Sequence, residues 1–237
     1  MGAATAKLFA EHGAKVVVSD INEETGQQVV DEIVAAGGTA SFCRTDVASA
    51  ADVAAMVQAA VDRYGRLDCA VNNAAITPDS HPVVDLDEAE FDAVIEVDLK
   101  GVALCMQAEL RQFHAQGDGG AIVNIGSVSS VRPQPNNVAY TAAKHAVLGM
   151  TKVASLENAP DGVRVNAVCP GAIDTPMLRG ALETMGATEE EFAPALSLLG
   201  RFGQPSEVAE ANVWLCSDAA SYITGASLMV DAGYTSR

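Results

Sequence analysis

The sequence predicts an α/β fold with a doubly wound parallel sheet, covered by helices on both faces to give three layers. Two observations predict it. Short apolar runs rich in β-branched residues alternate with helical segments from end to end, as in repeated β-α-β units. No linker, repeat or low-complexity segment interrupts the alternation. Because 49% of the 237 residues are hydrophobic, we expect one domain with one large core over residues 1–237.

The elements follow from hydrophobic spacing, which has a period of two in strands and about 3.6 in helices. The expected strands cover residues 15–20, 40–45, 67–71, 121–126, 163–168 and 228–231. The expected helices cover residues 2–12, 22–36, 49–64, 87–116, 138–158, 188–199 and 206–218. Asn22 is a good N-cap for the second helix. Residues 99–101 could interrupt the helix at 87–116.

Composition excludes several classes of function. A formal net charge of −17 argues against nucleic acid or an anionic membrane as a partner. The five cysteines are scattered without a CxxC spacing, and the four histidines show no ligand spacing, so we expect no metal site. No apolar run reaches the ~18 residues that span a membrane, and no signal or transit peptide is evident. We therefore expect a cytoplasmic protein in a reducing compartment.

Polar residues and glycine follow several of the expected strands. Asp20, Asp46, Asn73, Ser127 and Gly171 each lie where a strand ends. Ligands of open parallel sheets bind beyond the carboxyl ends of the strands. The sequence therefore predicts a ligand site along this edge.

The segment from Ser127 to Lys144 carries the candidate chemistry. Tyr140 and Lys144 are four residues apart in the expected helix 138–158, so their side chains lie on one face. A nearby ammonium favours the phenolate form of a tyrosine, which can then exchange a proton with an alcohol or ketone. Ser127 could bind the same oxygen. The plainer alternative is a surface Tyr and Lys without a joint role, because YxxxK is a common spacing.

The chain resembles the short-chain dehydrogenase/reductase family over essentially its whole length. The resemblance rests on six motifs that occur in the family's order and at similar spacing. They are Asn72-Asn73-Ala-Ala, Ile-Gly-Ser127, Tyr140-x-x-x-Lys144, Pro170-Gly171-Ala-Ile173-Asp-Thr175, Arg201-Phe-Gly-Gln-Pro205, and Ile223-Thr-Gly225 with Val230-Asp231-Ala-Gly233. The family has a Rossmann-type fold and interconverts alcohols and ketones with a nicotinamide cofactor.

The resemblance implies roles for matched positions. Tyr140 would be the general acid/base, Lys144 would favour its phenolate and bind the nicotinamide ribose, and Ser127 would hold the reacting oxygen. Residues at the strand ends would bind the cofactor. These are Gly2, Asp20, Ile21, Asp46, Val47, Asn73, Ala74, Tyr140, Lys144, Pro170, Gly171, Ile173 and Thr175.

Asp20 points to NAD rather than NADP. A carboxylate at this position binds the 2′-hydroxyl of the adenosine ribose and repels a 2′-phosphate. No Arg or Lys adjoins it in the stretch Ser19-Asp20-Ile21-Asn22. The alternative for Asp20 is a solvated carboxylate or a helix cap.

Three departures from the family pattern stand out. The first strand and the TGxxxGxG turn of the family have no counterpart before Met1-Gly2. We expect the missing strand to lie between the strands ending at Asp20 and Val71, and Met1 to be an internal methionine of a longer natural chain. Asp98 stands where the family has an asparagine of the proton relay, so we keep it as a catalytic candidate. Ala75 and Ala232 replace glycines, which is costly only where φ is positive.

The predicted reaction is the reversible oxidation of a secondary alcohol. Residues 175–200 would form a substrate lid, and the likeness is greatest to members that act on cyclic alcohols, cyclic diols and hydroxysteroids. Family analogy also implies a homodimer or homotetramer, paired through the helices at 87–116 and 138–158. Two alternatives remain: a catalytically impaired or truncated subunit with a binding role, and an isomerase or dehydratase that uses the same Tyr/Lys pair.

Overall fold

The computed structural model describes residues 1–236. The strands are β1 (Lys15–Asp20), β2 (Thr39–Arg44), β3 (Cys69–Asn72), β4 (Gly120–Ile125), β5 (Val163–Pro170) and β6 (Ser227–Val230). The helices are α1 (Gly2–Glu11), α2 (Glu23–Ala35), α3 (Ala50–Tyr64), α4 (Glu88–Ile95), α5 (Val102–Gln116), α6 (Val138–Asn158), α7 (Pro176–Met185), α8 (Glu189–Leu196) and α9 (Pro205–Cys216). The predicted elements are thus all present.

All strand pairs are parallel, as predicted, but the strands form two sheets. β1 pairs with β2, and the second sheet has the order β3-β4-β5-β6. The division falls between β1 and β3, where the resemblance placed the missing strand. In the part of the chain that the structure describes, no ladder joins these two strands.

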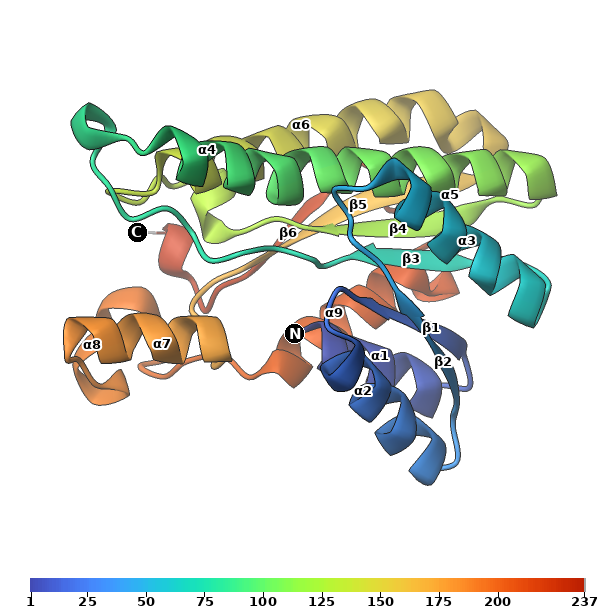
Figure 1. The fold of residues 1–237 in the computed structure, drawn as a ribbon, viewed down its shortest axis with the longest axis horizontal. Coiled ribbons are helices and arrows are strands. Elements are labelled where there is room, and N and C mark those ends of the chain that lie inside the picture. The colour runs from blue at the N-terminus through green and yellow to red at the C-terminus, as the bar shows by residue number, and fades with distance from the viewer. Residues whose placement is uncertain (237) are drawn as a thin grey trace.

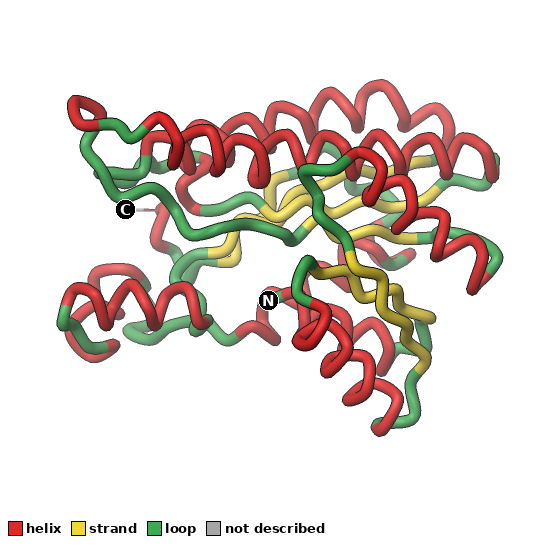
Figure 2. Tube along the Cα trace, in the orientation of Figure 1, coloured by secondary structure: helices red, strands yellow, loops and turns green. Residues whose placement is uncertain are grey.

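The helices cover both faces of the larger sheet, which gives the three predicted layers (Figure 1). α4, α5 and α6 lie on one face, and α9 packs on the other face against β4 and β5. α1 packs against α9 and so connects the small sheet with the large one. Figure 2 shows α7 and α8 as a separate helical pair beside the strand ends.

Local sequence accounts for the element boundaries. Asn22 caps α2 as predicted, since its Oδ1 accepts the N–H of Thr25 at 3.1 Å. Ser49 caps α3 in the same way, and Gly65 ends that helix in the left-handed conformation at φ 88°. The core between α5, α6 and the sheet contains Phe113, Ile122 and Val165 among its buried residues.

The interruption expected near residues 99–101 is confirmed, because α4 ends at Ile95, α5 begins at Val102, and a π-helical segment over Glu96–Gly101 separates them. The wider turn leaves Asp98 fully buried. Gly101 lies against Val47: a Cβ on Gly101 would come within 2.8 Å of the Val47 side chain. This segment therefore brings the end of β2 close to the helix that carries Asp98. π-segments of this kind are frequent at functional sites.

Across residues 1–236, no helix combines the length and apolarity required to cross a membrane.

Candidate active site

α6 carries Tyr140 in its first turn and Lys144 one turn later. Alanines on the buried face of α6, Ala139 and Ala143, let the helix pack closely against α4. The Nζ of Lys144 lies 5.4 Å from the centroid of the Tyr140 ring. The pair predicted from the four-residue spacing is therefore close in space, and the ammonium faces the ring of the tyrosine.

The Lys144 ammonium is paired inside the protein. Its Nζ lies 3.2 Å from Oδ2 of Asp98 and donates a hydrogen bond of 3.3 Å to the carbonyl of Ile125. Oδ1 of Asp98 accepts the N–H of Ile76 at 2.9 Å. Burial raises the pKa of Asp98, and the Lys144 charge offsets part of this increase. The Lys144–Asp98 contact is an ion pair with both side chains buried.

Ser127 lies directly after β4 and is buried. Its Oγ accepts the N–H of Ser129 at 3.1 Å, while its own N–H donates to Oγ of Ser130 at 3.1 Å. These reciprocal bonds fix the hydroxyl at the end of the strand. The thiol of Cys169, at the end of β5, lies beside Ser127 and Lys144, and burial raises the pKa of that thiol to about 11. The thiol therefore stays neutral at physiological pH.

Asp79 is a buried neighbour of Tyr140 that the sequence patterns did not single out. Its two carboxylate oxygens accept the backbone N–H groups of Ala139 and Tyr140, each at 3.0 Å. The contact joins residues 60 positions apart, so helical or strand spacing carries no signal for it.

Gly2 and Asn73 are brought together at the end of β3. A Cβ on Gly2 would come within 2.8 Å of Nδ2 of Asn73, so a side chain at Gly2 would displace the Asn73 amide. Oδ1 of Asn73 is buried and accepts no hydrogen bond from the described residues. A buried acceptor without a donor is unusual in a folded protein. The pair therefore fits a cleft in which a bound group supplies the missing donor, and Ala74 lies exposed beside it.

The residues expected at the adenosine end lie after β1 and β2. Oδ1 of Asp20 accepts the N–H of Asn22 at 2.8 Å, which holds this exposed carboxylate at the end of β1. Ile21 is exposed next to it. Oδ1 of Asp46 accepts the N–H of Ala48 at 2.9 Å, and Val47 packs on Gly101.

The segment after β5 is held rigidly. Pro170 ends the strand, and a Cβ on Gly171 would come within 2.9 Å of the Asp231 backbone, so no side chain fits there. Ile173 is buried and pairs with Gly203 through a short β-bridge. Thr175 caps α7, its Oγ1 accepting the N–H of Leu178 at 3.4 Å.

α7 and α8 cover one side of this segment. Their apolar side chains, including Leu182 and Phe192, form a cluster around Phe202, while Met177 and Met185 remain exposed. Arg179 joins the pair: it bonds Asp174 at 2.6 and 2.8 Å and Glu189 at 2.9 Å.

The two alanines that replace glycines behave differently. Ala232 has a positive φ of 49°, whereas Ala75 is not among the residues with positive φ. A left-handed backbone at a residue with a Cβ costs about 1–2 kcal/mol. The replacement is therefore costly at Ala232 only.

Comparison with known proteins identifies the family of the chain. A family model described as enoyl-(acyl carrier protein) reductase matches residues 1–235. The chain is 45% identical to a short chain dehydrogenase/reductase astE of Aspergillus oryzae, over 98% of this chain and 90% of that protein. It is 43% identical to a cyclohexanol dehydrogenase of Acinetobacter sp., over 100% of this chain and 91% of that protein.

Solved structures agree with the curated relatives. A short-chain type dehydrogenase/reductase from Mycobacterium marinum superposes with a TM-score of 0.92 at 34% identity, covering 100% of this chain and 91% of that one. Levodione reductase superposes with a TM-score of 0.91 at 34% identity, covering 99% and 93%. The chain is an oxidoreductase, and it belongs to the short-chain dehydrogenase/reductase family.

Proposed function

We propose that the protein interconverts a secondary alcohol and a ketone with NAD(H), and that Tyr140 is its general acid/base. The observation that carries this proposal is the buried Lys144 ammonium 5.4 Å from the Tyr140 ring. A positive charge held there favours the phenolate, and the buried Ser127 hydroxyl at the end of β4 is suited to bind an oxygen.

In the oxidation direction, Oη of Tyr140 accepts the proton of the substrate hydroxyl. Ser127 donates a hydrogen bond to the same oxygen and so selects its position. Lys144 stabilises the negative charge on the tyrosine oxygen, and Asp98 holds Lys144 in place. In the reverse direction Tyr140 returns the proton to the ketone oxygen. Asp98 is therefore a positioning residue that acts through Lys144.

The cofactor supplies the hydride acceptor, or the donor in the reverse reaction. Two observations support a dinucleotide cleft: the unpartnered buried oxygen of Asn73 and the close approach of Gly2 to the Asn73 amide. The residues proposed to hold it are Gly2, Asp20, Ile21, Asp46, Val47, Asn73, Ala74, Tyr140, Lys144, Pro170, Gly171, Ile173 and Thr175. We favour NAD because the Asp20 carboxylate would repel a 2′-phosphate.

For the substrate we propose a cyclic alcohol or diol. Relatives include the cyclohexanol dehydrogenase and, at 41% identity, a 2,5-dichloro-2,5-cyclohexadiene-1,4-diol dehydrogenase of Sphingobium indicum. Residues 175–200 are the proposed lid, since α7 and α8 lie beside the segment after β5 and leave Met177 exposed.

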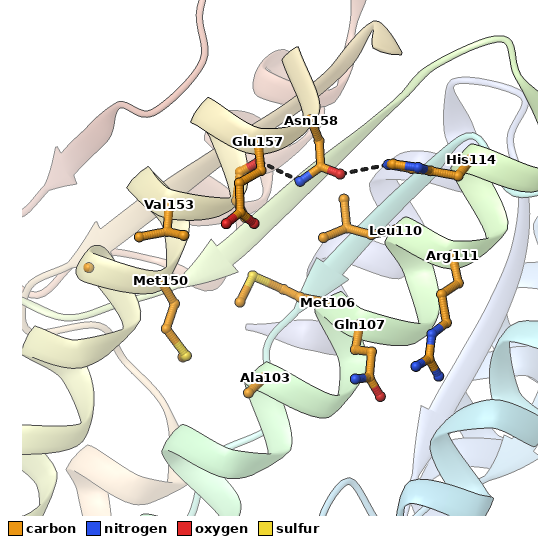
Figure 3. A pocket seen from close by; sticks show the side chains of 12 residues that line it. Ala103, Met106, Gln107, Leu110, Arg111, His114, Met150, Val153, Glu157 and Asn158 are labelled. Atoms are coloured by element: carbon orange, nitrogen blue, oxygen red, sulfur yellow. Dashed lines mark hydrogen bonds between the residues drawn. The ribbon is translucent and has the colours of Figure 1, made fainter. Parts of the chain in front are cut away.

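We also propose that the protein forms homodimers or higher homo-oligomers through α5 and α6. A groove of about 790 Å³ lies between these helices, and Figure 3 shows Met106, Leu110, Met150 and Val153 along it. Arg111 of α5 and Glu157 of α6 also line it, from the two different helices. In a two-fold contact the same patch meets itself, and a patch that carries both Arg111 and Glu157 allows opposite charges to meet between copies.

The test is Tyr140→Phe, assayed with NAD and a panel of cyclic secondary alcohols by the absorbance of the reduced cofactor. We expect turnover to disappear while NAD binding, measured by fluorescence titration, remains. Tyr222→Phe is the matched control because Tyr222 is fully exposed. Retained turnover in Tyr140→Phe would refute the role of Tyr140, and an absence of NAD binding in the unmodified protein would favour the catalytically impaired alternative.

A further inference from the structure

The first turn of α6 is capped by a residue from a distant loop. The first N–H groups of a helix need acceptors from outside the helix, and no side-chain cap comes from Asn137, the residue that precedes α6. Asp79 supplies both oxygens of its carboxylate, to Ala139 and to Tyr140, at 3.0 Å each. Only 5% of Asp79 is exposed. One of the two N–H groups belongs to the proposed acid/base itself.

The same loop is also tied to Lys144. Ile76, three residues before Asp79, donates its N–H to Oδ1 of Asp98 at 2.9 Å. The other oxygen of Asp98 lies 3.2 Å from Nζ of Lys144. Two buried carboxylates thus connect the segment 76–79 with both members of the Tyr/Lys pair, one through a backbone N–H and one through the ammonium.

Further contacts hold this segment against its surroundings. The side-chain amide of Asn137 donates to the backbone carbonyl of Asp79. His81 forms a β-bridge with Asn137, and its Nδ1 lies 2.9 Å from Oε2 of Glu90 on α4. The segment is therefore fixed to both α4 and α6, which is what a positioning element needs, because its own geometry must be rigid.

We propose that Asp79 is a positioning residue, which sets the place of Tyr140 relative to Lys144 and the substrate oxygen. The proposal rests on the proposed function of Tyr140 as acid/base. Proton transfer requires hydrogen-bond distance between Oη and the substrate, and a misplacement of about 1 Å can reduce a rate about a hundredfold. The alternative is an ordinary helix cap, whose loss lowers stability but leaves the kinetics unchanged.

Asp79→Ala and Asp79→Asn test the proposal, with Asp87→Ala as the matched control. Asp87 is also an aspartate cap in this region: its Oδ1 accepts the N–H of Glu90 at 3.0 Å, but on α4. In Asp79→Ala we expect kcat for the alcohol to fall about tenfold to hundredfold, while NAD binding is unchanged. Asp79→Asn keeps one oxygen acceptor for the two N–H groups, so its kcat should lie in between. Asp87→Ala should keep the kcat of the unmodified protein.

Hydrogen exchange of the amides provides a readout that does not depend on activity. Asp79→Ala should lose protection at Ala139 and Tyr140, and Asp87→Ala should not. Unchanged protection in Asp79→Ala would overturn the proposal whatever the activity, and lost protection with unchanged kcat would reduce Asp79 to a stabilising cap. If Asp79→Ala does not fold, the isosteric Asp79→Asn gives both measurements. Failure of the proposed function itself would appear separately, as turnover in Tyr140→Phe.

Discussion

The ammonium of Lys144 lies 3.2 Å from the carboxylate of Asp98, and both side chains are buried, at 2% and 0% exposure. Water does not screen this pair, so the negative charge of Asp98 acts strongly on Lys144. The carboxylate therefore cancels part of the field of the ammonium that lies 5.4 Å from the Tyr140 ring. An asparagine at the same position could accept the N–H of Ile76 without that charge.

The first prediction follows from this pair. Asp98→Asn removes the negative charge beside Lys144 and keeps an oxygen that can accept the N–H of Ile76. We expect the pH profile of kcat/KM for alcohol oxidation to lose the change that the ionisation of Asp98 produces, because the asparagine does not titrate. The measurement is the initial rate with NAD and a cyclic alcohol across a series of buffers.

Burial raises the pKa of Asp98, so its ionisation should change kcat/KM of the unmodified protein within the pH profile. As the pH falls, Asp98 becomes protonated at a higher pH than an ordinary aspartate. The kcat/KM of the unmodified protein should change at that pH, whereas the kcat/KM of Asp98→Asn should not. Lys100→Gln is a suitable control for a general charge effect, because Lys100 lies on the same π-segment but pairs with Glu96 at 2.5 Å on the surface. A profile of Asp98→Asn that coincides with the unmodified one would contradict the assignment.

The second prediction concerns cofactor choice. Asp20→Ala removes the carboxylate proposed to bind the ribose hydroxyls, and a hydrogen bond to a charged group contributes about 1.5–3 kcal/mol. We expect the Kd for NAD to rise about tenfold to a hundredfold, and NADP binding to improve because the repulsion is gone. Titration of both dinucleotides by fluorescence measures this. Asp31→Ala, an exposed carboxylate on α2, controls for the loss of surface charge, and an unchanged ratio of the two affinities in Asp20→Ala would exclude Asp20 as the selector.

Local patterns predicted the elements well, and they failed where contacts join distant parts of the chain. α6 begins and ends at the predicted residues because its apolar spacing is regular and its start follows a loop with two prolines. The sequence indicated an interruption near residues 99–101 but not its form, a π-segment over Glu96–Gly101.

The site residues were likewise predictable where they follow from local patterns, and not where they depend on contacts between distant parts of the chain. Tyr140 and Lys144 came from a spacing within one helix, and the remaining positions came from strand ends and a family resemblance. Asp79 did not, because its partners are 60 and 61 residues away. The pairing of Gly2 with Asn73 likewise depends on how α1 meets the end of β3, which no local rule determines.

The third prediction concerns Glu109, a buried carboxyl on α5. Oε2 of Glu109 accepts Nδ2 of Asn72 at 3.1 Å, and Asn72 also bonds Asn124 at 2.9 Å. Burial raises the pKa of Glu109 to about 7 from an ordinary value of 4.5, although the Asn72 bond opposes this. Between pH 4.5 and about 7, Glu109 is protonated in the folded state and ionised in the unfolded chain. The free energy of unfolding should therefore decrease as the pH rises through this range, and the contribution of Glu109 should be constant above it.

The free energy involved is on the order of 3 kcal/mol, from the difference between the two pKa values. Glu109→Gln keeps an oxygen acceptor for Asn72 and cannot ionise. We expect this variant to be more stable than the unmodified protein above about pH 7. Its free energy of unfolding should fall much less as the pH rises between the two pKa values, as measured by urea denaturation at several pH values. The control is Glu210→Gln, on the exposed side of α9, whose free energy of unfolding should still decrease with pH like that of the unmodified protein. If Glu109→Gln shows the same decrease, Glu109 is not its source.

The last prediction tests the α5–α6 groove as the contact between copies. Val153 lines this groove and is 53% exposed. If a second copy covers it, Val153→Glu buries an unpaired carboxylate, which costs several kcal/mol in each copy and should dissociate the oligomer. The matched control is Val34→Glu on α2, because Val34 is 54% exposed and does not line the groove. Light scattering coupled to size-exclusion chromatography should give a smaller assembly for Val153→Glu only. An unmodified protein that is monomeric, or a Val153→Glu variant of unchanged mass, would contradict the α5–α6 groove as the contact between copies, since an unpaired glutamate buried there could not be tolerated.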